Sequence, residues 1–497
     1  MAGIPAGGGN APVAALRALA PGGLVLFARD VPSIDAAQER VSHIRRQLEC
    51  DAGLPLSICV DQEGGRVARV PRDVPMPSML TLGASADVGL AEQVGAALAA
   101  DVRAVGGNVD FAPVLDLALS PESTVVGTRS LGTDPALVAR LGAALVRGLQ
   151  TGGVAAVVKH FPGHGATSQD SHVAMPVVET GAAVLDAREL VPFRAAFAAG
   201  ARGVMSAHVR FTALDGAHPA TMSQNIVGAL LRDALHFDGV CFTDCLEMAG
   251  TGAEGTVAGG VAALRAGADA LVVSHSIERA TELRDAIVLA VTSGSVPLDR
   301  LRAASRRVDA LRASHARRAD VAPVDGALVA REVARRAIVV VRGDAALRLD
   351  RPVTVVSFEG SASDGVADGA EERPSLNLAL RRRRVRSELL RVAPAPDESM
   401  RAMLVDVLEG RDAELVILAR RAHLHGAQRE AIDALVAAYP AALVVSMLEP
   451  FDVPAFARAR NVACTFGDES TNVEALADVL TGADAARGHM PVAVAPA

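Results

Sequence analysis

The sequence has very few aromatic side chains. Among its 497 residues there is no tryptophan, one tyrosine (Tyr439) and 12 phenylalanines, so aromatic residues make up only 3% of the chain. Proteins that hold long nucleic acids or polysaccharides usually stack bases or sugar rings on aromatic platforms. The composition therefore disfavours a long cleft for a polymer.

Cysteine is also scarce, and no CxxC pair occurs. The number of cysteines is odd: Cys50, Cys59, Cys241, Cys245 and Cys464. Three of the five lie within apolar runs, a pattern that predicts buried free thiols in a reducing compartment and argues against a structural zinc site.

Long apolar runs and a strong net charge are missing as well. No stretch approaches the ~18 apolar residues that span a bilayer, and residues 1–9 contain neither the basic nor the apolar segment of a signal peptide. We expect a cytoplasmic protein that does not bind membranes, with export of a longer precursor left open. The net charge of −8 gives no general attraction to nucleic acid. A small-molecule substrate is expected instead, and the oligomeric state is left unassigned.

The chain does contain a regular alternation of apolar and amphipathic segments. It is longer than one ordinary domain, and half of its residues are hydrophobic. Between residues 20 and 310, short runs rich in Val, Ile, Leu and Phe alternate with segments of helical character such as 34–48 and 137–149. The short runs occupy residues 24–27, 56–60, 109–115, 154–158, 203–207, 240–243 and 270–273.

Such apolar strands between amphipathic helices are typical of parallel βα units. Seven units within about 300 residues predict an α/β fold of the (β/α)8 TIM-barrel type, with one strand unaccounted for. Either the first strand precedes Met1, with residues 4–9 as its remnant, or the barrel is irregular.

Polar or ionisable residues follow each predicted strand. In chain order they are Arg29, Asp30, Asp61, Glu63, Asp116, Lys159, His160, His208, Asp244 and His275. Any one of them could be a solvated loop residue. Together they predict an active site, because barrel enzymes carry their chemistry at the carboxyl ends of the strands.

A smaller second domain is expected after the barrel. Helical sequence over residues 298–318 closes the first domain (1–318), and residues 319–326 (ADVAPVDG) have the turn composition of a linker. Residues 327–497 again alternate strands and helices, which predicts a three-layer α/β sandwich. Its strands are expected at residues 337–341, 353–358, 415–419, 443–447 and 462–466. The absence of a GxGxxG fingerprint argues against a dinucleotide site there.

Two strand ends carry groups suited to nucleophilic and acid/base chemistry. Asp244 directly follows the strand 240–243, so its carboxylate should point into the barrel mouth. A Gly/Pro loop after strand 154–158 presents Asp170 and His172, whose spacing places both side chains on one side of an extended backbone. The aspartate can stabilise a protonated imidazole, which makes the pair a general acid/base. A carboxylate nucleophile with a separate acid/base is typical of retaining glycosidases.

A metal-dependent barrel hydrolase is the competing interpretation. The candidate zinc ligands are His160, His164, His172, His208, His275 and Asp244. Against this interpretation, no His-x-His motif follows the first predicted strand, and a Pro-Gly turn separates His160 from His164.

Five motifs resemble those of a known family. They are residues 61–69 (DQEGGRVAR), 111–116 (FAPVLD), 159–165 (KHFPGHG), 170–172 (DSH) and 243–248 (TDCLEM). Their order and spacing resemble family 3 glycoside hydrolases of the β-N-acetylglucosaminidase (NagZ-like) branch, which remove terminal N-acetylglucosamine during peptidoglycan turnover. The second domain resembles the C-terminal α/β sandwich of longer members, down to GHMPV at residues 488–492.

The resemblance implies roles for individual residues. Asp244 would be the nucleophile that forms a covalent glycosyl-enzyme, His172 the acid/base and Asp170 its partner. The sugar hydroxyls and the N-acetyl group would be held by Asp61, Arg69, Arg129, Lys159 and His160. No metal or organic cofactor is expected. Cys245 departs from the pattern, since Asp or Ala more commonly follows the nucleophile.

The resemblance implies a retaining β-N-acetylglucosaminidase, and the missing tryptophans suit a pocket for one terminal sugar, hence exo action. A phosphorylase on the same scaffold is a close alternative, since a histidine acid/base repels phosphate less than a second carboxylate would. A metal-dependent hydrolase and a catalytically silent sugar-binding protein are further alternatives.

Overall fold

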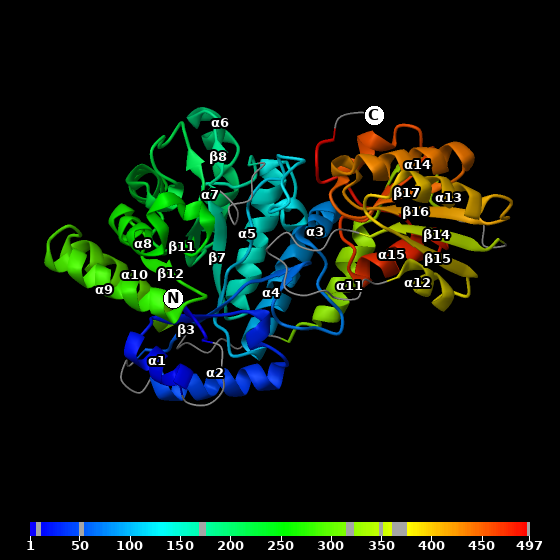
Figure 1. Ribbon diagram of the computed structural model, residues 1–497. Helices are drawn as coiled ribbons and strands as arrows, with labels where there is room; N and C mark the ends of the chain where they lie inside the picture. Colours follow the sequence, from blue (N-terminus) through cyan, green and yellow to red (C-terminus); the bar gives the residue numbers. More distant parts are fainter. Residues whose placement is uncertain are drawn as a thin grey trace.

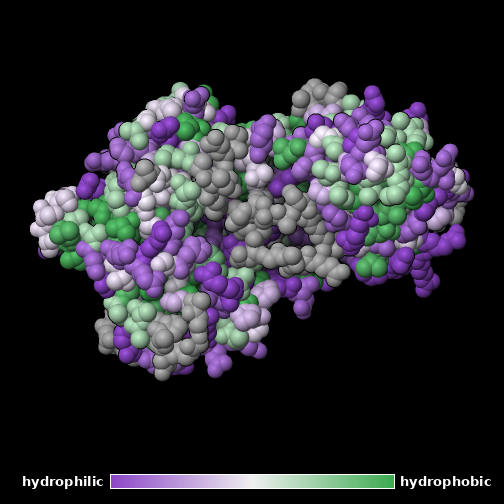
Figure 2. Space-filling model, viewed as in Figure 1, coloured by the Kyte–Doolittle hydropathy of each residue, from purple (hydrophilic) through white to green (hydrophobic). Residues whose placement is uncertain are grey.

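The computed structural model describes residues 1–5, 11–48, 54–167, 175–314, 323–346, 351–359 and 375–494. A barrel surrounded by helices forms the blue-to-green part of the chain, and an α/β unit forms the yellow-to-red part (Figure 1). Within these ranges, no helix is long and apolar enough to cross a membrane. Figure 2 shows hydrophilic and hydrophobic residues interspersed over both units on the face in view.

Eight parallel strands form the barrel, which confirms the predicted (β/α)8 architecture. In sheet order they are β1 (Ala2–Gly3), β2 (Gly23–Leu26), β3 (Ser57–Val60), β6 (Val109–Asp110), β7 (Ala155–Phe161), β9 (Gly203–Ser206), β11 (Val240–Cys245) and β12 (Ala270–Val272). A parallel bridge between Ala2 and Val273 links the last strand to the first. The Met1 ammonium also donates a hydrogen bond of 2.7 Å to the carbonyl oxygen of Leu271.

The strand that the sequence pattern left unaccounted for is β1. It lies at Ala2–Gly3, ahead of the remnant expected at residues 4–9, of which 6–9 lie outside the described part of the chain. A strand of two residues cannot show a periodic pattern, so it escapes detection. Only glycine fits at position 3, because a Cβ there would lie 1.9 Å from the carbonyl oxygen of Ser274.

Two central strands differ in length from the prediction. Pairing in β6 stops at Asp110, although the apolar run continues to Leu115. Strand β7 instead extends to Phe161 and is buried throughout, so Lys159 and His160 belong to the strand. The barrel therefore carries two ionisable side chains, Lys159 and His160, inside strand β7.

Helices surround the barrel. They are α1 (Ala11–Leu19), α2 (Ile34–Leu48), α3 (Met79–Ser85), α4 (Val88–Ala104), α5 (Pro135–Thr151), α6 (Ala182–Ala187), α7 (Leu190–Ala198), the π-helix η5 (Gln224–Ala234), α8 (Gly255–Ala266), α9 (Ile277–Thr292) and α10 (Leu298–Ser314). Helix α5 shows why they form. Asp134 caps its first amide groups, Pro135 occupies its first turn, and Leu141, Leu145 and Leu149 fall on one buried face.

The second unit is a three-layer α/β sandwich, as predicted. Its sheet has the order β13 (Val339–Arg342), β18 (Asn461–Cys464), β17 (Leu443–Ser446), β16 (Glu414–Ala419), β14 (Val353–Phe358) and β15 (Ser387–Val392), with only β13 antiparallel. One face packs against α11 (Gly326–Ala337), α12 (Leu376–Arg382) and α15 (Ser470–Leu480). The other face packs against α13 (Glu398–Leu408) and α14 (Gly426–Ala438).

The sequence pattern misses one strand of this sheet, β15. Among the described residues it pairs only with β14, so it forms an edge of the sheet. Charged residues, Glu388 and Arg391, interrupt its apolar positions and are exposed. A half-exposed edge strand therefore lacks the continuous apolar run by which the other strands of the sheet were found.

Helix α11 connects the two units and packs against both. Its residues Val329, Ala330 and Val333 join the barrel's apolar core, whereas Ala334 joins a core layer of the sandwich. In Figure 1 the helix lies beside α3, between the two units. The predicted linker at residues 319–326 falls partly outside the described residues, and Gly326 already belongs to α11.

Candidate active site

A cavity of about 220 Å³ opens at the carboxyl ends of the barrel strands. The predicted site residues that line it are Asp61, Arg69, Arg129, Lys159, His160 and Asp244. The structure thus brings together groups from strands β7 and β11, from the segment after β3 and from the loop after β6. The predicted acid/base pair, Asp170 and His172, lies outside the described residues.

A buried network of two cations and two carboxylates forms one wall. The Lys159 ammonium lies 2.6 Å from Asp61 Oδ1 and 2.6 Å from Glu63 Oε1. Arg129 donates through Nε and Nη2 to both oxygens of Glu63, each at 2.8 Å. This bidentate pairing fixes the plane of the guanidinium. Of the four side chains, Asp61 is the most exposed, at 20%.

The network keeps Glu63 and Lys159 ionised. Burial opposes the charge of Glu63, but Arg129 and Lys159 outweigh that effect and hold its pKa well below the ordinary value. Burial likewise opposes the charge of Lys159, and Asp61 with Glu63 raises its pKa nonetheless. The cavity therefore offers fixed charges that can make directional hydrogen bonds to sugar hydroxyls.

Asp116 orients the imidazole of His160. One carboxylate oxygen lies 2.6 Å from His160 Nδ1, and the other accepts the backbone N–H of His164 at 2.6 Å. Burial opposes ionisation of Asp116, yet His160 lowers its pKa. Burial, reinforced by the nearby His160, lowers the pKa of His164 to about 4, so His164 is neutral at pH 7.

Asp244 lies near the end of β11, inside the cavity lining. Its Oδ1 accepts the backbone N–H of Cys245 at 2.7 Å. That bond holds one oxygen of the carboxylate at the strand end. The position agrees with the expectation that this carboxylate faces the barrel mouth.

Among the described residues, the histidines considered as zinc ligands do not converge on one site with Asp244. Both ring nitrogens of His208 have partners, with Thr221 Oγ1 and the Cys245 carbonyl oxygen each at 3.0 Å. His164 Nδ1 lies 2.8 Å from Thr167 Oγ1. In the described part of the chain, the one group with metal-binding spacing is Cys245, Glu247 and His275.

Two further carboxylates of the site are not among the residues to which the sequence pattern assigns a role. Glu63 and Asp116 both follow predicted strands, and both are now seen to hold site residues in place. The position of each carboxylate at the end of an apolar strand is a signal for such a role, because a buried carboxylate needs a cationic or hydrogen-bonding partner. Their partners, Arg129 and Lys159 for Glu63 and His160 for Asp116, are site residues in each case.

The second unit supports the loop that carries Arg129. Glu449, which pairs with Arg421 at 3.0 Å, stands against Gly127, where a Cβ would lie 2.2 Å from Glu449 Oε1. His423 Nε2 also contacts the Pro121 carbonyl oxygen at 2.9 Å. One wall of the cavity is thus braced from outside the barrel.

Replacing Gly127 by alanine should weaken the site without touching the cavity. Position 127 has a φ of +42° as well as the close Glu449 contact, so a side chain there must displace the backbone that leads to Arg129. We expect kcat/KM to fall by about 10- to 100-fold, mainly through KM, since a displacement of ~1 Å can cost that much. Steady-state kinetics will show this. Gly181→Ala is the matched control, because its Cβ would meet nothing within 4 Å. Activity of Gly127→Ala within twofold of wild type would contradict the bracing role.

Comparison with known proteins finds relatives of the barrel and a solved structure that matches almost the whole chain. The model of the glycosyl hydrolase family 3 N-terminal domain matches residues 11–311. The β-hexosaminidase of Methylococcus capsulatus is 39% identical over 273 residues, covering 54% of this chain and 80% of that protein. The β-hexosaminidase of Chromobacterium violaceum is 38% identical over 301 residues, covering 58% and 82%.

A solved structure extends the likeness to the second unit. The family 3 β-N-acetylglucosaminidase from Paenibacillus sp. strain FPU-7 superposes with a TM-score of 0.92 at 33% identity, covering 99% of this chain and 97% of that one. With the family model matching more than half of its residues, this chain belongs to glycoside hydrolase family 3.

Proposed function

We propose that this glycoside hydrolase is a retaining exo-β-N-acetylglucosaminidase that acts on peptidoglycan-derived fragments. The observation that carries the proposal is the position of Asp244, whose carboxylate lines the same cavity as the Lys159, Glu63 and Arg129 network. β-Hexosaminidases among the relatives and a β-N-acetylglucosaminidase among the solved structures support the sugar class.

The proposed reaction has two balanced steps. Asp244 attacks the anomeric carbon, the bond to the leaving oxygen breaks, and His172 gives its proton to that oxygen. Water then attacks the anomeric carbon and gives a proton to His172, and the bond between that carbon and the Asp244 oxygen breaks, which restores the Asp244 carboxylate. Asp170 would stabilise the imidazolium form of His172, which is present before the first step and is regenerated in the second.

The size of the cavity supports removal of one terminal sugar. At about 220 Å³ it is smaller than the ~300–1,000 Å³ of sites for drug-sized ligands. Asp61, the most exposed member of the ionic network, would accept a hydrogen bond from a sugar hydroxyl. Lys159 and Arg129 would donate to other polar groups of the same sugar.

The described cysteines agree with the proposed cytoplasmic location. Cys59, Cys241, Cys245 and Cys464 are free thiols. Thiols persist in that form where glutathione and thioredoxin keep cysteine reduced. The proposed partner is a small glycoside rather than nucleic acid or a membrane.

One assay separates this proposal from its alternatives. We expect wild-type protein to cleave a chromogenic β-N-acetylglucosaminide and to release N-acetylglucosamine first as the β-anomer, detectable by proton NMR. Addition of inorganic phosphate should leave the product unchanged. Formation of N-acetylglucosamine 1-phosphate would instead identify a phosphorylase. Saturable binding of the sugar without turnover would identify a silent binding protein.

A further inference from the structure

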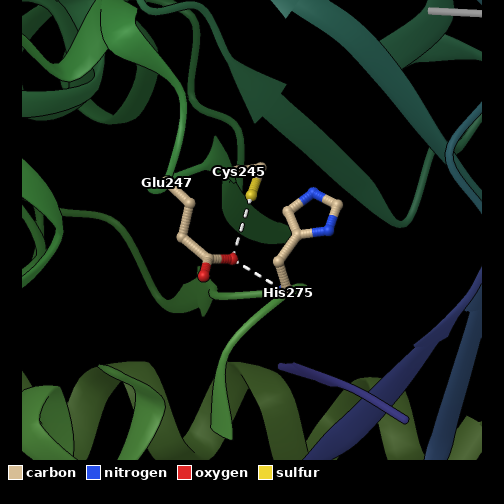
Figure 3. A group of neighbouring side chains, drawn as sticks. All are labelled: Cys245, Glu247 and His275. Atoms are coloured by element: carbon tan, nitrogen blue, oxygen red, sulfur yellow. Dashed lines mark hydrogen bonds between the residues drawn. The ribbon is translucent and has the colours of Figure 1, made fainter. Parts of the chain in front are cut away.

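Three side chains with metal-binding chemistry meet at the edge of the cavity. Cys245 ends β11, Glu247 follows it in the next turn, and His275 lies in the loop after β12 (Figure 3). One ligand atom from each side chain lies within 4.8 Å of the other two. We propose that these residues form a zinc site that inhibits the enzyme when it is occupied.

The sulfur and the carboxylate already have the spacing of zinc ligands. Cys245 Sγ lies 3.6 Å from Glu247 Oε2. In a tetrahedral site with Zn–S of ~2.3 Å and Zn–O of ~2.1 Å, two such ligands are about 3.6 Å apart. Only His275 needs to adjust. Its imidazole is exposed and lies against the Phe27 ring with centroids 5.2 Å apart, so rotation about its side-chain bonds would exchange that contact for the metal.

The surrounding groups fix two of the ligands. Glu247 accepts the backbone N–H groups of His275 and Ser276 at 2.7 and 2.9 Å, so its carboxylate is oriented without using all of its lone pairs. The Ser274 hydroxyl lies 3.1 Å from Cys245 Sγ. Hydrogen bonds that orient ligating groups in this way are typical of metal sites.

The chemistry of the set favours zinc over calcium or magnesium. A thiol and an imidazole are ligands for Zn²⁺, whereas Ca²⁺ and Mg²⁺ require oxygen. On binding, the Cys245 S–H bond breaks, a sulfur–metal bond forms, and the proton leaves to solvent. Three protein ligands leave one tetrahedral position for water.

The position of the site predicts its effect. Cys245 and His275 line the same cavity as Asp244, the residue that precedes Cys245 in β11. A bound dication would attract the Asp244 carboxylate and occupy space beside it, so the nucleophile would be held away from the anomeric carbon. This consequence rests on the proposed glycosidase function; the binding of metal does not.

The binding test uses cobalt as an optical probe. We expect wild-type protein to bind one equivalent of Co²⁺, with a thiolate-to-cobalt charge-transfer band and the visible bands of tetrahedral cobalt, and Zn²⁺ should displace it. Cys245→Ser should abolish the charge-transfer band, and His275→Ala should weaken affinity by more than about 100-fold, beyond the loss expected for an outer hydrogen-bond partner. His218→Ala, at another exposed histidine, is the matched control and should bind like wild type. An unchanged band in Cys245→Ser, or no tetrahedral cobalt spectrum in wild type, would overturn the site.

A second arm tests inhibition. Zn²⁺ should lower the rate of glycoside cleavage in wild type, a chelator should restore it, and Cys245→Ser should lose at least tenfold in sensitivity when each protein is normalised to its own metal-free rate. Retained sensitivity in that variant would contradict the inhibitory role. If wild type lacks glycosidase activity altogether, the proposed function fails, while the cobalt spectra still decide the metal site.

Discussion

Replacement of Asp244 by alanine is expected to lower kcat/KM for a chromogenic β-N-acetylglucosaminide by about 10⁴-fold or more. Removal of a nucleophile eliminates the covalent pathway, and the remaining rate comes from binding and acid/base assistance alone. A 10⁴-fold loss corresponds to roughly 5.5 kcal/mol of transition-state stabilisation. The variant should still fold, because the buried network around Glu63 does not include Asp244.

Azide distinguishes a lost nucleophile from a damaged site. The smaller alanine leaves room for a small anion on the side of the sugar from which Asp244 attacks. Azide should therefore restore turnover of an activated substrate in Asp244→Ala and yield the α-glycosyl azide, which NMR can identify. Asp299→Ala, at an exposed position on α10, controls for the loss of an aspartate elsewhere. Retention of more than a tenth of wild-type activity would assign the nucleophile to another residue.

The barrel and its active face follow from local sequence patterns. Strands such as β3 and helices such as α2 carry their own apolar periodicity, so each can be predicted without knowledge of its neighbours. The active face then follows from the polarity of βα units, since all strands of a parallel barrel end on one side. Asp61 and Lys159 can be predicted as active-site residues in this way.

Local sequence patterns do not predict which side chains Asp61 and Lys159 contact. Lys159 and Asp61 are 98 positions apart, and their 2.6 Å contact exists only because β3, β6 and β7 are neighbours in the closed sheet. The length of β7 also depends on contacts between residues far apart in the sequence. A lysine normally ends an apolar strand, but Lys159 stays inside β7 because Asp61 and Glu63 neutralise it.

The contact by which the second unit supports the active site cannot be predicted from the sequence pattern at all. Glu449 stands against Gly127 across more than 300 positions of chain. No local motif predicts such a contact, because it depends on how α11 packs the sandwich against the barrel. The curated relatives match little more than half of this chain, so their similarity does not reveal it either.

The largest loss of stability is expected from Glu63→Gln. A neutral amide cannot balance Arg129 and Lys159, which are 4% and 3% exposed and would be left with Asp61 as their only carboxylate of the network. Breaking a buried ion pair by removing one partner typically costs ~3–5 kcal/mol. We expect a loss of that size in the free energy of unfolding at pH 7, measured by urea denaturation. Activity should fall as well, because both cations line the cavity.

A surface pair provides the control. Glu92 and Arg147 lie 3.1 Å apart with both side chains more than 40% exposed. Because exposed pairs contribute ~0–1 kcal/mol, Glu92→Gln should change the unfolding free energy by no more than about 1 kcal/mol. Equal losses in the two variants would mean that burial of the Glu63 network has no special effect on stability.

The pH dependence of this difference gives an independent check. The pKa of Glu63 is lower in the folded protein than its ordinary value of 4.5, so folding favours the ionised form. The stabilisation is therefore fully present above pH ~4.5 and decreases as the pH falls toward the folded-state pKa, where the wild-type carboxylate also becomes neutral. The gap in unfolding free energy between wild type and Glu63→Gln should be constant from pH 6 to 8 and narrow below about pH 4.5. If the difference in unfolding free energy stays constant below pH 4.5, the loss of stability in Glu63→Gln comes from the shape of the amide rather than from the missing charge.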